Sequence, residues 1–175
     1  LPGSRLRFNL SHTDGLMCLG VTRERDVGVD VEHVLRRVSA LEIADRFFAA
    51  RELSDLRALP AATQRQRFFH YWTLKEAYIK GRGMGLALPL GKFAYTVRGG
   101  QPLDLWVDAE LDDEADSWRL CLLAPSHRHT AAVAARQHGD APLALTTRTC
   151  VPLRHEQTCQ LAPLASRLRP LPGGR

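Results

Sequence analysis

Two carboxylates separated by one residue stand in the segment VGVDVE, at Asp30 and Glu32. Successive side chains of a strand point to opposite faces, so the two acids share one face and Val27, Val29 and Val31 share the other. Like charges on one face repel unless a positive charge lies between them. Mg²⁺ suits such a pair because it prefers hard oxygen ligands and often binds carboxylates together with substrate phosphates. A solvated strand face gives the same D-x-E pattern, so the pair alone leaves both interpretations open.

The segment YWTLKEAYIK, residues 71–80, places a third carboxylate, Glu76, between Lys75 and Lys80. The chain has 24 Lys and Arg, and these two are among its three lysines. On a helix, Glu76 and Lys80 lie one turn apart at the edge of an apolar arc. Lys75 falls inside that arc, where an ammonium group needs an anion or water. This arrangement favours a site for phosphate, although an ordinary surface ion pair would also explain Glu76 and Lys80.

The segment SHTDG adds a histidine, His12, directly after a predicted strand, where a loop side chain can point into a cleft. A lone loop histidine is more often an ordinary surface residue than a functional one. His127 and His129 form an H-x-H pair with no further ligand nearby in the sequence. The glycines of GRGMG follow a helical segment, whereas a phosphate-binding glycine loop should precede one. Neither of the last two motifs is therefore a candidate site.

Strands and helices can be assigned from the hydrophobic pattern. The sequence predicts strands over 6–10, 15–23 and 26–34, helices over 39–48, 50–59 and 63–80, and further strands over 93–97, 103–107, 118–124 and 129–135. On the longest helix the apolar arc consists of Phe68, Tyr71, Trp72, Leu74, Tyr78 and Ile79. Runs of strands around a helical insert predict an α+β fold, an antiparallel sheet with a long packed helix.

The composition predicts one domain over residues 1–136, followed by a tail over 137–175. The tail holds five of the ten prolines, no aromatic residue, and five arginines against Asp140 and Glu156, so it is expected to be extended or disordered. Much of the net charge of +5 lies there, so the basic balance of the chain says little about nucleic-acid binding. No apolar run is long enough to span a membrane, and no signal peptide is recognisable. Four scattered cysteines predict reduced thiols in a cytoplasmic protein.

Taken in order, FNLSHTDG, VGVDVE, FFAARE and WTLKEAYIKGRGMGLALPL resemble the 4′-phosphopantetheinyl transferases of the surfactin-synthetase-activating type. The likeness covers residues 6–98 and extends more loosely to about 136. It implies one lobe of a pseudo-dimeric α+β fold, mostly the C-terminal half, with coenzyme A and Mg²⁺ at the junction of the lobes. Such enzymes move the phosphopantetheine arm of coenzyme A onto a serine of an apo acyl or peptidyl carrier protein and release 3′,5′-ADP. Carrier proteins of this kind serve fatty-acid, polyketide and nonribosomal-peptide biosynthesis.

The resemblance also implies roles for individual residues. The metal ligands would be Asp30, Glu32 and Glu76; the catalytic residues Glu76 and Lys80; and the groups that bind coenzyme phosphates Ser11, His12, Lys75 and Lys80. This agrees with the residue chemistry, since cleavage of a pyrophosphate depends mainly on positioning and charge stabilisation. A lysine ammonium on its flexible stem can stabilise negative charge on the phosphates more adaptably than a rigid guanidinium group. A carboxylate can accept the proton of the attacking serine.

Other interpretations remain at this point. The first lobe of the family is nearly absent, so the chain could be an inactive or carrier-binding fragment, or could pair as a homo-oligomer. A Mg²⁺-dependent nuclease or phosphohydrolase also combines D-x-E with Glu and Lys. Those enzymes usually set Glu and Lys two residues apart on a strand, whereas here they are four apart on a helix. The chain also lacks the interleaved basic and aromatic residues of a nucleic-acid surface.

Overall fold

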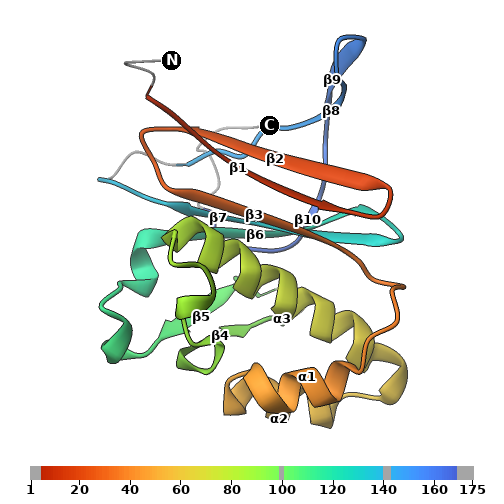
Figure 1. Ribbon diagram of the computed structural model, residues 1–175, viewed down its shortest axis with the longest axis vertical. Coiled ribbons are helices and arrows are strands. Elements are labelled where there is room, and N and C mark those ends of the chain that lie inside the picture. Colours follow the sequence, from red (N-terminus) through yellow and green to blue (C-terminus); the bar gives the residue numbers. More distant parts are fainter. Residues whose placement is uncertain (1–4, 99–100, 140–142, 169–175) are drawn as a thin grey trace.

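The computed structural model describes residues 5–98, 101–139 and 143–168. A long helix crosses one face of an antiparallel sheet, and a two-stranded hairpin lies on the other side (Figure 1). The helices are α1 (Ala40–Phe47), α2 (Ala50–Ala58) and α3 (Ala61–Arg82), and the short 3-10 turns are η1 (Gly85–Ala87), η2 (Leu90–Lys92), η3 (Ala109–Leu111) and η4 (Ala115–Ser117). The strands are β1 (Leu6–Thr13), β2 (Leu16–Arg23), β3 (Val27–His33), β4 (Phe93–Thr96), β5 (Asp104–Val107), β6 (Trp118–Ser126), β7 (His129–Arg136), β8 (Thr147–Val151), β9 (His155–Cys159) and β10 (Pro163–Ser166). The predicted α+β class is confirmed.

Helix α3 is the central element of the core, and its position agrees with the predicted helix to within two residues at each end. The members of the predicted apolar arc are buried, apart from Trp72, which is partly buried. The helix ends at Gly83, which takes the left-handed conformation at φ 68° and donates its backbone N–H to Ile79 and Lys80. A glycine at this position ends a helix without steric cost. The local pattern therefore sets both the length and the buried face of α3.

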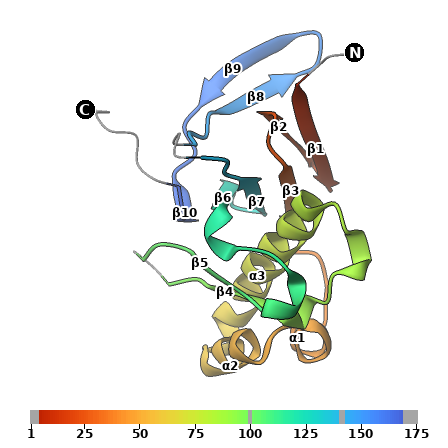
Figure 2. The same cartoon turned by 90° about the vertical axis from the view of Figure 1, so that its left-hand side faces the viewer.

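The main sheet has the strand order β10-β6-β7-β3, so β3 lies at one edge beside β7. Figure 2 shows β10 at the opposite edge, next to β6. On β3, Val27, Val29 and Val31 pack on the side away from α3, and Gly28 and Asp30 face the helix. The predicted alternation on this strand is confirmed.

A close contact between β3 and α3 depends on two glycines. A Cβ atom at Gly28 would lie 1.9 Å from the carbonyl oxygen of Ala77, and one at Gly81 would lie 2.9 Å from the ring of Trp118. Only residues without a side chain fit at such distances. The strand can therefore approach the helix backbone closely, and this brings the carboxylates of β3 within reach of side chains on α3.

The β1–β2 hairpin runs beside β3 and is joined to it by side chains. Val29 N–H donates to Asn9 Oδ1 at 2.9 Å, and Val31 N–H donates to Ser11 Oγ at 3.3 Å. The polar atoms of Asn9 and Ser11 thus satisfy backbone donors of an edge strand. His12 lies within β1, opposite Met17, rather than in a loop after the strand. Asp14 and Gly15 form the turn between β1 and β2, as Asp-Gly sequences commonly do in hairpins, and Gly15 has a φ of 77°.

The outer face of the hairpin is apolar and exposed. Leu6, Phe8 and Leu10 alternate along β1 as the buried face of a half-buried strand would, but they are exposed, Phe8 to 73%. The hairpin face as a whole consists of Leu6, Phe8 and Leu10 on β1 with Met17, Leu19 and Val21 on β2. Within residues 5–98, 101–139 and 143–168, nothing covers this face enough to bury it.

The segment beyond residue 136 contains three strands. β8 and β9 form a hairpin, and β10 pairs with β6 in the main sheet, with Ala165 opposite Leu122. Composition did not reveal that this segment adds an edge strand, because the pairing partner lies elsewhere in the chain. The domain boundary near residue 136 stays a prediction.

The four cysteines are free thiols, and no described helix is long and apolar enough to cross a bilayer.

Candidate active site

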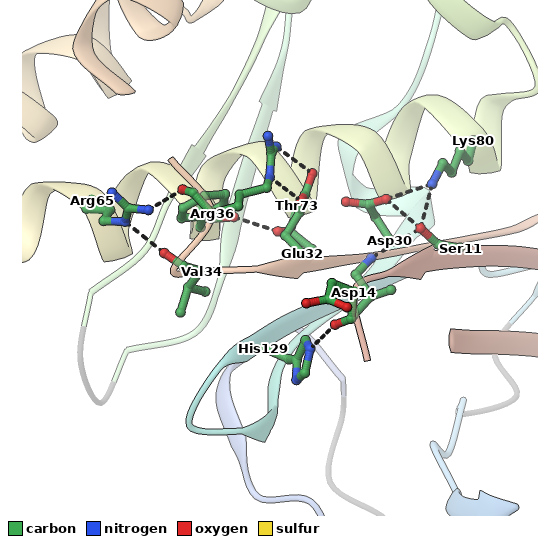
Figure 3. Close-up of polar contacts among 12 residues, drawn as sticks. Ser11, Asp14, Asp30, Glu32, Val34, Arg36, Arg65, Thr73, Lys80 and His129 are labelled. Carbon is green, nitrogen blue, oxygen red and sulfur yellow. Dashed lines mark hydrogen bonds and ion pairs between the residues drawn. The ribbon is translucent and has the colours of Figure 1, made fainter. Parts of the chain in front are cut away.

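Asp30 is the centre of a polar cluster between β3 and α3 (Figure 3). Its Oδ1 accepts hydrogen bonds from Lys80 Nζ at 2.7 Å and from Ser11 Oγ at 2.9 Å. Lys80 Nζ also donates to Ser11 Oγ at 3.1 Å. The other oxygen, Oδ2, is buried and has no hydrogen-bond partner in the described part of the chain. A buried carboxylate oxygen without a partner is costly, so this atom points to a missing ligand.

The partner of Lys80 is the strand carboxylate rather than its helical neighbour. Among the described residues, no ion pair joins Lys80 to Glu76, although they are one turn apart. The side chain of Asp30 is only 7% exposed, and an ion pair is stronger where water is excluded. The sequence interpretation of Glu76 and Lys80 as a plain surface pair is therefore wrong.

Glu32, two residues further along β3, lies against a different cation. Arg36 Nε donates to Glu32 Oε2 at 2.9 Å, and Arg36 Nη2 donates to Oε1 at 3.1 Å. Both carboxylate oxygens are therefore engaged by one guanidinium group, as Figure 3 shows. Arg36 was not among the predicted site residues, although a basic residue four positions after an acid is a recognisable signal.

The carboxylates of Asp30, Glu32 and Glu76 influence one another electrostatically. Burial raises the pKa of Glu76, and the charges of Asp30 and Glu32 raise it further, whereas Lys80 opposes the shift. Burial also raises the pKa of Glu32; the bond and charge of Arg36 lower it, and Asp30 adds a smaller upward effect. Three acids that repel one another across a strand and a helix create a site where a cation is favourable.

The donor set suits a divalent cation in chemical type. Mg²⁺ prefers carboxylate oxygens, and the buried Oδ2 of Asp30 lacks a partner among the described residues. In this arrangement Lys80 and Arg36 neutralise two of the three acids. Within the described ranges, no three His, Cys, Asp or Glu side chains are arranged closely enough to form a metal site. The set of three ligands therefore stays a prediction.

Two residues that were expected to bind coenzyme phosphates lie on β1 at neighbouring positions. Ser11 is buried in the polar cluster with Asp30 and Lys80. His12 is exposed, and alternation along the strand turns it away from the face that Ser11 occupies. The structure thus brings Ser11 into the cluster and leaves His12 outside it.

Lys75 occupies a different environment from the one that was expected. Its side chain is 0% exposed and lies 2.8 Å from Glu52 Oε2, and its Nζ donates to the carbonyl oxygens of Leu90 (2.7 Å) and Phe93 (2.6 Å). All three ammonium donors are used within the core. In this arrangement no ammonium donor of Lys75 is left for a coenzyme phosphate, and the predicted phosphate contact stays a prediction. The acid of FFAARE, Glu52, is its partner, and the sequence signal was a lysine inside an apolar arc, which requires a buried anion.

Another acid with a buried side chain, Asp113, fixes the C-terminal end of α3. It accepts a hydrogen bond from Trp118 Nε1 at 2.8 Å and one from Tyr78, and it forms ion pairs with Arg82, at 2.7 Å, and Arg136. Burial alone would raise the pKa of Asp113, but these bonds and charges lower it below its ordinary value. Because α3 carries Glu76 and Lys80, this network helps to position the site. No local pattern in the sequence distinguished Asp113 from its acidic neighbours.

Comparisons with known proteins relate this arrangement to one family. Residues 26–135 match the family described as the 4′-phosphopantetheinyl transferase superfamily. The 4′-phosphopantetheinyl transferase HetI of Nostoc sp. is 39% identical over 140 residues, which cover 79% of this chain and 55% of the relative. The 4′-phosphopantetheinyl transferase Sfp of Bacillus subtilis is 40% identical over 87 residues, 50% of this chain and 38% of the relative. The chain thus spans about half the length, or less, of these relatives.

A solved structure has a similar fold. The holo-[acyl-carrier-protein] synthase of Thermotoga maritima superposes with a TM-score of 0.51 at 17% sequence identity, over 79% of this chain and 84% of that one. At this identity the likeness concerns the fold alone.

Proposed function

The chain belongs to the 4′-phosphopantetheinyl transferase superfamily, and from that premise we propose that it transfers the 4′-phosphopantetheine arm of coenzyme A to a serine of an apo acyl or peptidyl carrier protein, with release of 3′,5′-ADP. The observation that carries the proposal is the cluster around Asp30. The buried carboxylate of Asp30 forms an ion pair with Lys80, and its other oxygen has no partner among the described residues. Its charge, like that of Glu32, raises the pKa of Glu76. The proposed location is the cytoplasm, where such substrates are made.

Asp30, Glu32 and Glu76 would hold Mg²⁺, which neutralises charge on phosphate oxygens when it is bound. Glu76 is the base in this proposal. Its pKa is raised towards neutral pH, and a base whose pKa lies nearer the operating pH transfers protons more efficiently. The serine gives its proton to Glu76, the new bond joins serine Oγ to the β-phosphorus, and the pyrophosphate bond of coenzyme A breaks. The leaving 3′,5′-ADP then gains a negative charge.

In this proposal Lys80 compensates that charge. Its side chain is 28% exposed, so the ammonium can leave Asp30 Oδ1 and reach a phosphate oxygen without crossing the core. A compact ammonium on a flexible stem suits this movement better than a planar guanidinium. Ser11 lies within hydrogen-bond distance of both Lys80 and Asp30 and restricts where the ammonium rests.

Incubation with coenzyme A, Mg²⁺ and an apo carrier protein is expected to add one phosphopantetheine to the carrier, read by intact-protein mass. Lys80→Ala should slow the transfer about 10²-fold, because charge on the leaving group is no longer compensated. Transfer at the wild-type rate by this variant would refute the role of Lys80. Carrier binding without a mass shift would instead indicate a binding fragment. Cleavage of plasmid DNA under the same conditions would favour the Mg²⁺-dependent nuclease.

We further propose that the protein forms homo-oligomers through the apolar face of the β1–β2 hairpin. Exposed apolar patches of this kind are typical of protein–protein interfaces. Light scattering after size exclusion should give a mass above the 19.5 kDa of one chain. Phe8→Ser with Leu19→Ser should restore the monomer, whereas Leu153→Ser, on the exposed β8–β9 turn, should leave the mass unchanged. An active wild-type monomer would contradict this proposal.

A further inference from the structure

Arg36, in the loop that follows β3, forms an ion pair with Glu32. The proposed metal site requires the same Glu32 carboxylate as a ligand. The guanidinium group donates one hydrogen bond to each carboxylate oxygen, at 2.9 and 3.1 Å. Such paired, charge-assisted bonds are about twice as strong as neutral ones and fix the geometry of both groups. The Glu32 side chain is 14% exposed and that of Arg36 is 42% exposed, so the pair is shielded on the carboxylate side.

The position of Arg36 is fixed by the chain around it. Its guanidinium carbon lies 5.3 Å from the centre of the Phe69 ring on α3. Its carbonyl oxygen accepts a hydrogen bond from Arg65, which also donates to the carbonyl oxygen of Val34 at 2.8 Å. Figure 3 shows the loop held against α3 by these contacts. Arg36 therefore belongs to a built arrangement rather than to a freely moving surface.

The two acids of β3 differ in what they offer to a cation. Asp30 keeps one buried oxygen, Oδ2, without a partner in the described chain, and Lys80 occupies only Oδ1. Glu32 has both oxygens engaged by Arg36. A divalent ion that takes Glu32 as a ligand must displace at least one of these bonds, and it must share the carboxylate with a positive charge.

On the basis of the proposed metal site, we propose that Arg36 is an internal competitor of the divalent cation for Glu32. It neutralises Glu32 while the site holds no metal, and it lowers the affinity of the site for the ion. Arg36 is a positioning residue in this view, because it acts through Glu32. Removal of its guanidinium should therefore strengthen metal binding, in contrast to removal of a ligand.

The test is a Mn²⁺ titration of the full chain without coenzyme A or carrier protein, with free Mn²⁺ read by electron paramagnetic resonance. Arg36→Gln should bind Mn²⁺ about 3- to 10-fold more tightly than wild type, the scale of a charge-assisted pair that is partly screened by solvent. Arg36→Lys keeps the charge but loses the planar fork, so its affinity should lie between the two. Arg37→Gln makes the same charge change at an exposed neighbouring position and should change the affinity less than about twofold.

The Mn²⁺ affinity of Asp30→Asn tests whether the metal site exists, independently of whether Arg36 competes for Glu32. Weaker binding by Asp30→Asn together with tighter binding by Arg36→Gln supports both. Weaker binding by Asp30→Asn with unchanged affinity in Arg36→Gln and Arg36→Lys overturns the competitor role and leaves the metal site intact. Absence of Mn²⁺ binding in wild type and in both Arg36 variants overturns the metal site and the competitor role together. Circular dichroism of each variant confirms that folded proteins are compared.

Discussion

Lys75→Met is expected to destabilise the fold by about 3–5 kcal/mol, because it leaves a buried carboxylate without its cation. Glu52 and Lys75 are both 0% exposed and lie 2.8 Å apart. Methionine fills most of the space of the lysine stem but supplies no positive charge. Among the described residues, Glu52 would keep as partners the backbone N–H groups of Ala49 and Tyr95, at 3.1 and 2.9 Å. Urea unfolding followed by fluorescence measures the loss.

Burial of the charged Glu52–Lys75 pair itself costs folding free energy, so a variant that removes both charges is informative. Burial raises the pKa of Glu52 and lowers the pKa of Lys75, and in each case the partner's charge opposes the shift. Removal of both charges in Lys75→Met/Glu52→Gln should therefore recover part of the stability lost by Lys75→Met alone. Lys92→Met, in an exposed ion pair with Asp108 and Glu110, is the matched control and should change little.

The outcome also distinguishes the two roles considered for Lys75. A buried structural role predicts that Lys75→Met lowers the midpoint of unfolding and that the remaining folded protein keeps the KM for coenzyme A that the proposed transfer shows in wild type. A folded variant with unchanged stability and a raised KM would contradict this and would restore the phosphate contact expected from the sequence.

Local periodicity in the sequence was sufficient for the elements that carry the site. The apolar arc on residues 68–79 predicted which face of α3 is buried, and alternation on β3 predicted that its acids and valines face opposite ways. Both patterns depend only on the geometry of one element. The predicted helix over 63–80 is two residues short at each end; Gly81 lies within α3, and Gly83, in the left-handed conformation, ends it.

The pairings within the site could not be derived in this way, because they join elements that are distant in sequence. The i,i+4 rule favoured Glu76 for Lys80, but the close contact of β3 with α3 at Gly28 offered a more buried partner, Asp30. In the same way, Glu52 is the partner of Lys75 only because α2 packs against α3. Tertiary contacts decide which of several nearby charges meet, and spacing along one helix does not contain that information.

Glu76→Gln is expected to lower the transfer rate about 10²- to 10⁴-fold, the range for loss of a general base. Glutamine has nearly the same shape as glutamate but cannot accept the serine proton, and it is a weaker ligand for a divalent ion. The rate is measured with an apo carrier protein under saturating coenzyme A. Glu110→Gln, which removes an acid that is 73% exposed in its side chain, serves as the control and should retain wild-type activity.

The same substitution should not weaken the fold, which separates a catalytic role from a structural one. Burial and the charges of Asp30 and Glu32 raise the pKa of Glu76, so its ionised form is disfavoured in the folded protein, and Lys80 offsets only part of this. Above the folded-state pKa that penalty is present, and a neutral glutamine removes it. At neutral pH without added metal, Glu76→Gln should therefore unfold at the same temperature as wild type or a higher one. An inactive variant that unfolds at a markedly lower temperature would show that Glu76 supports the fold instead, and a stable variant with full activity would remove it from the chemistry.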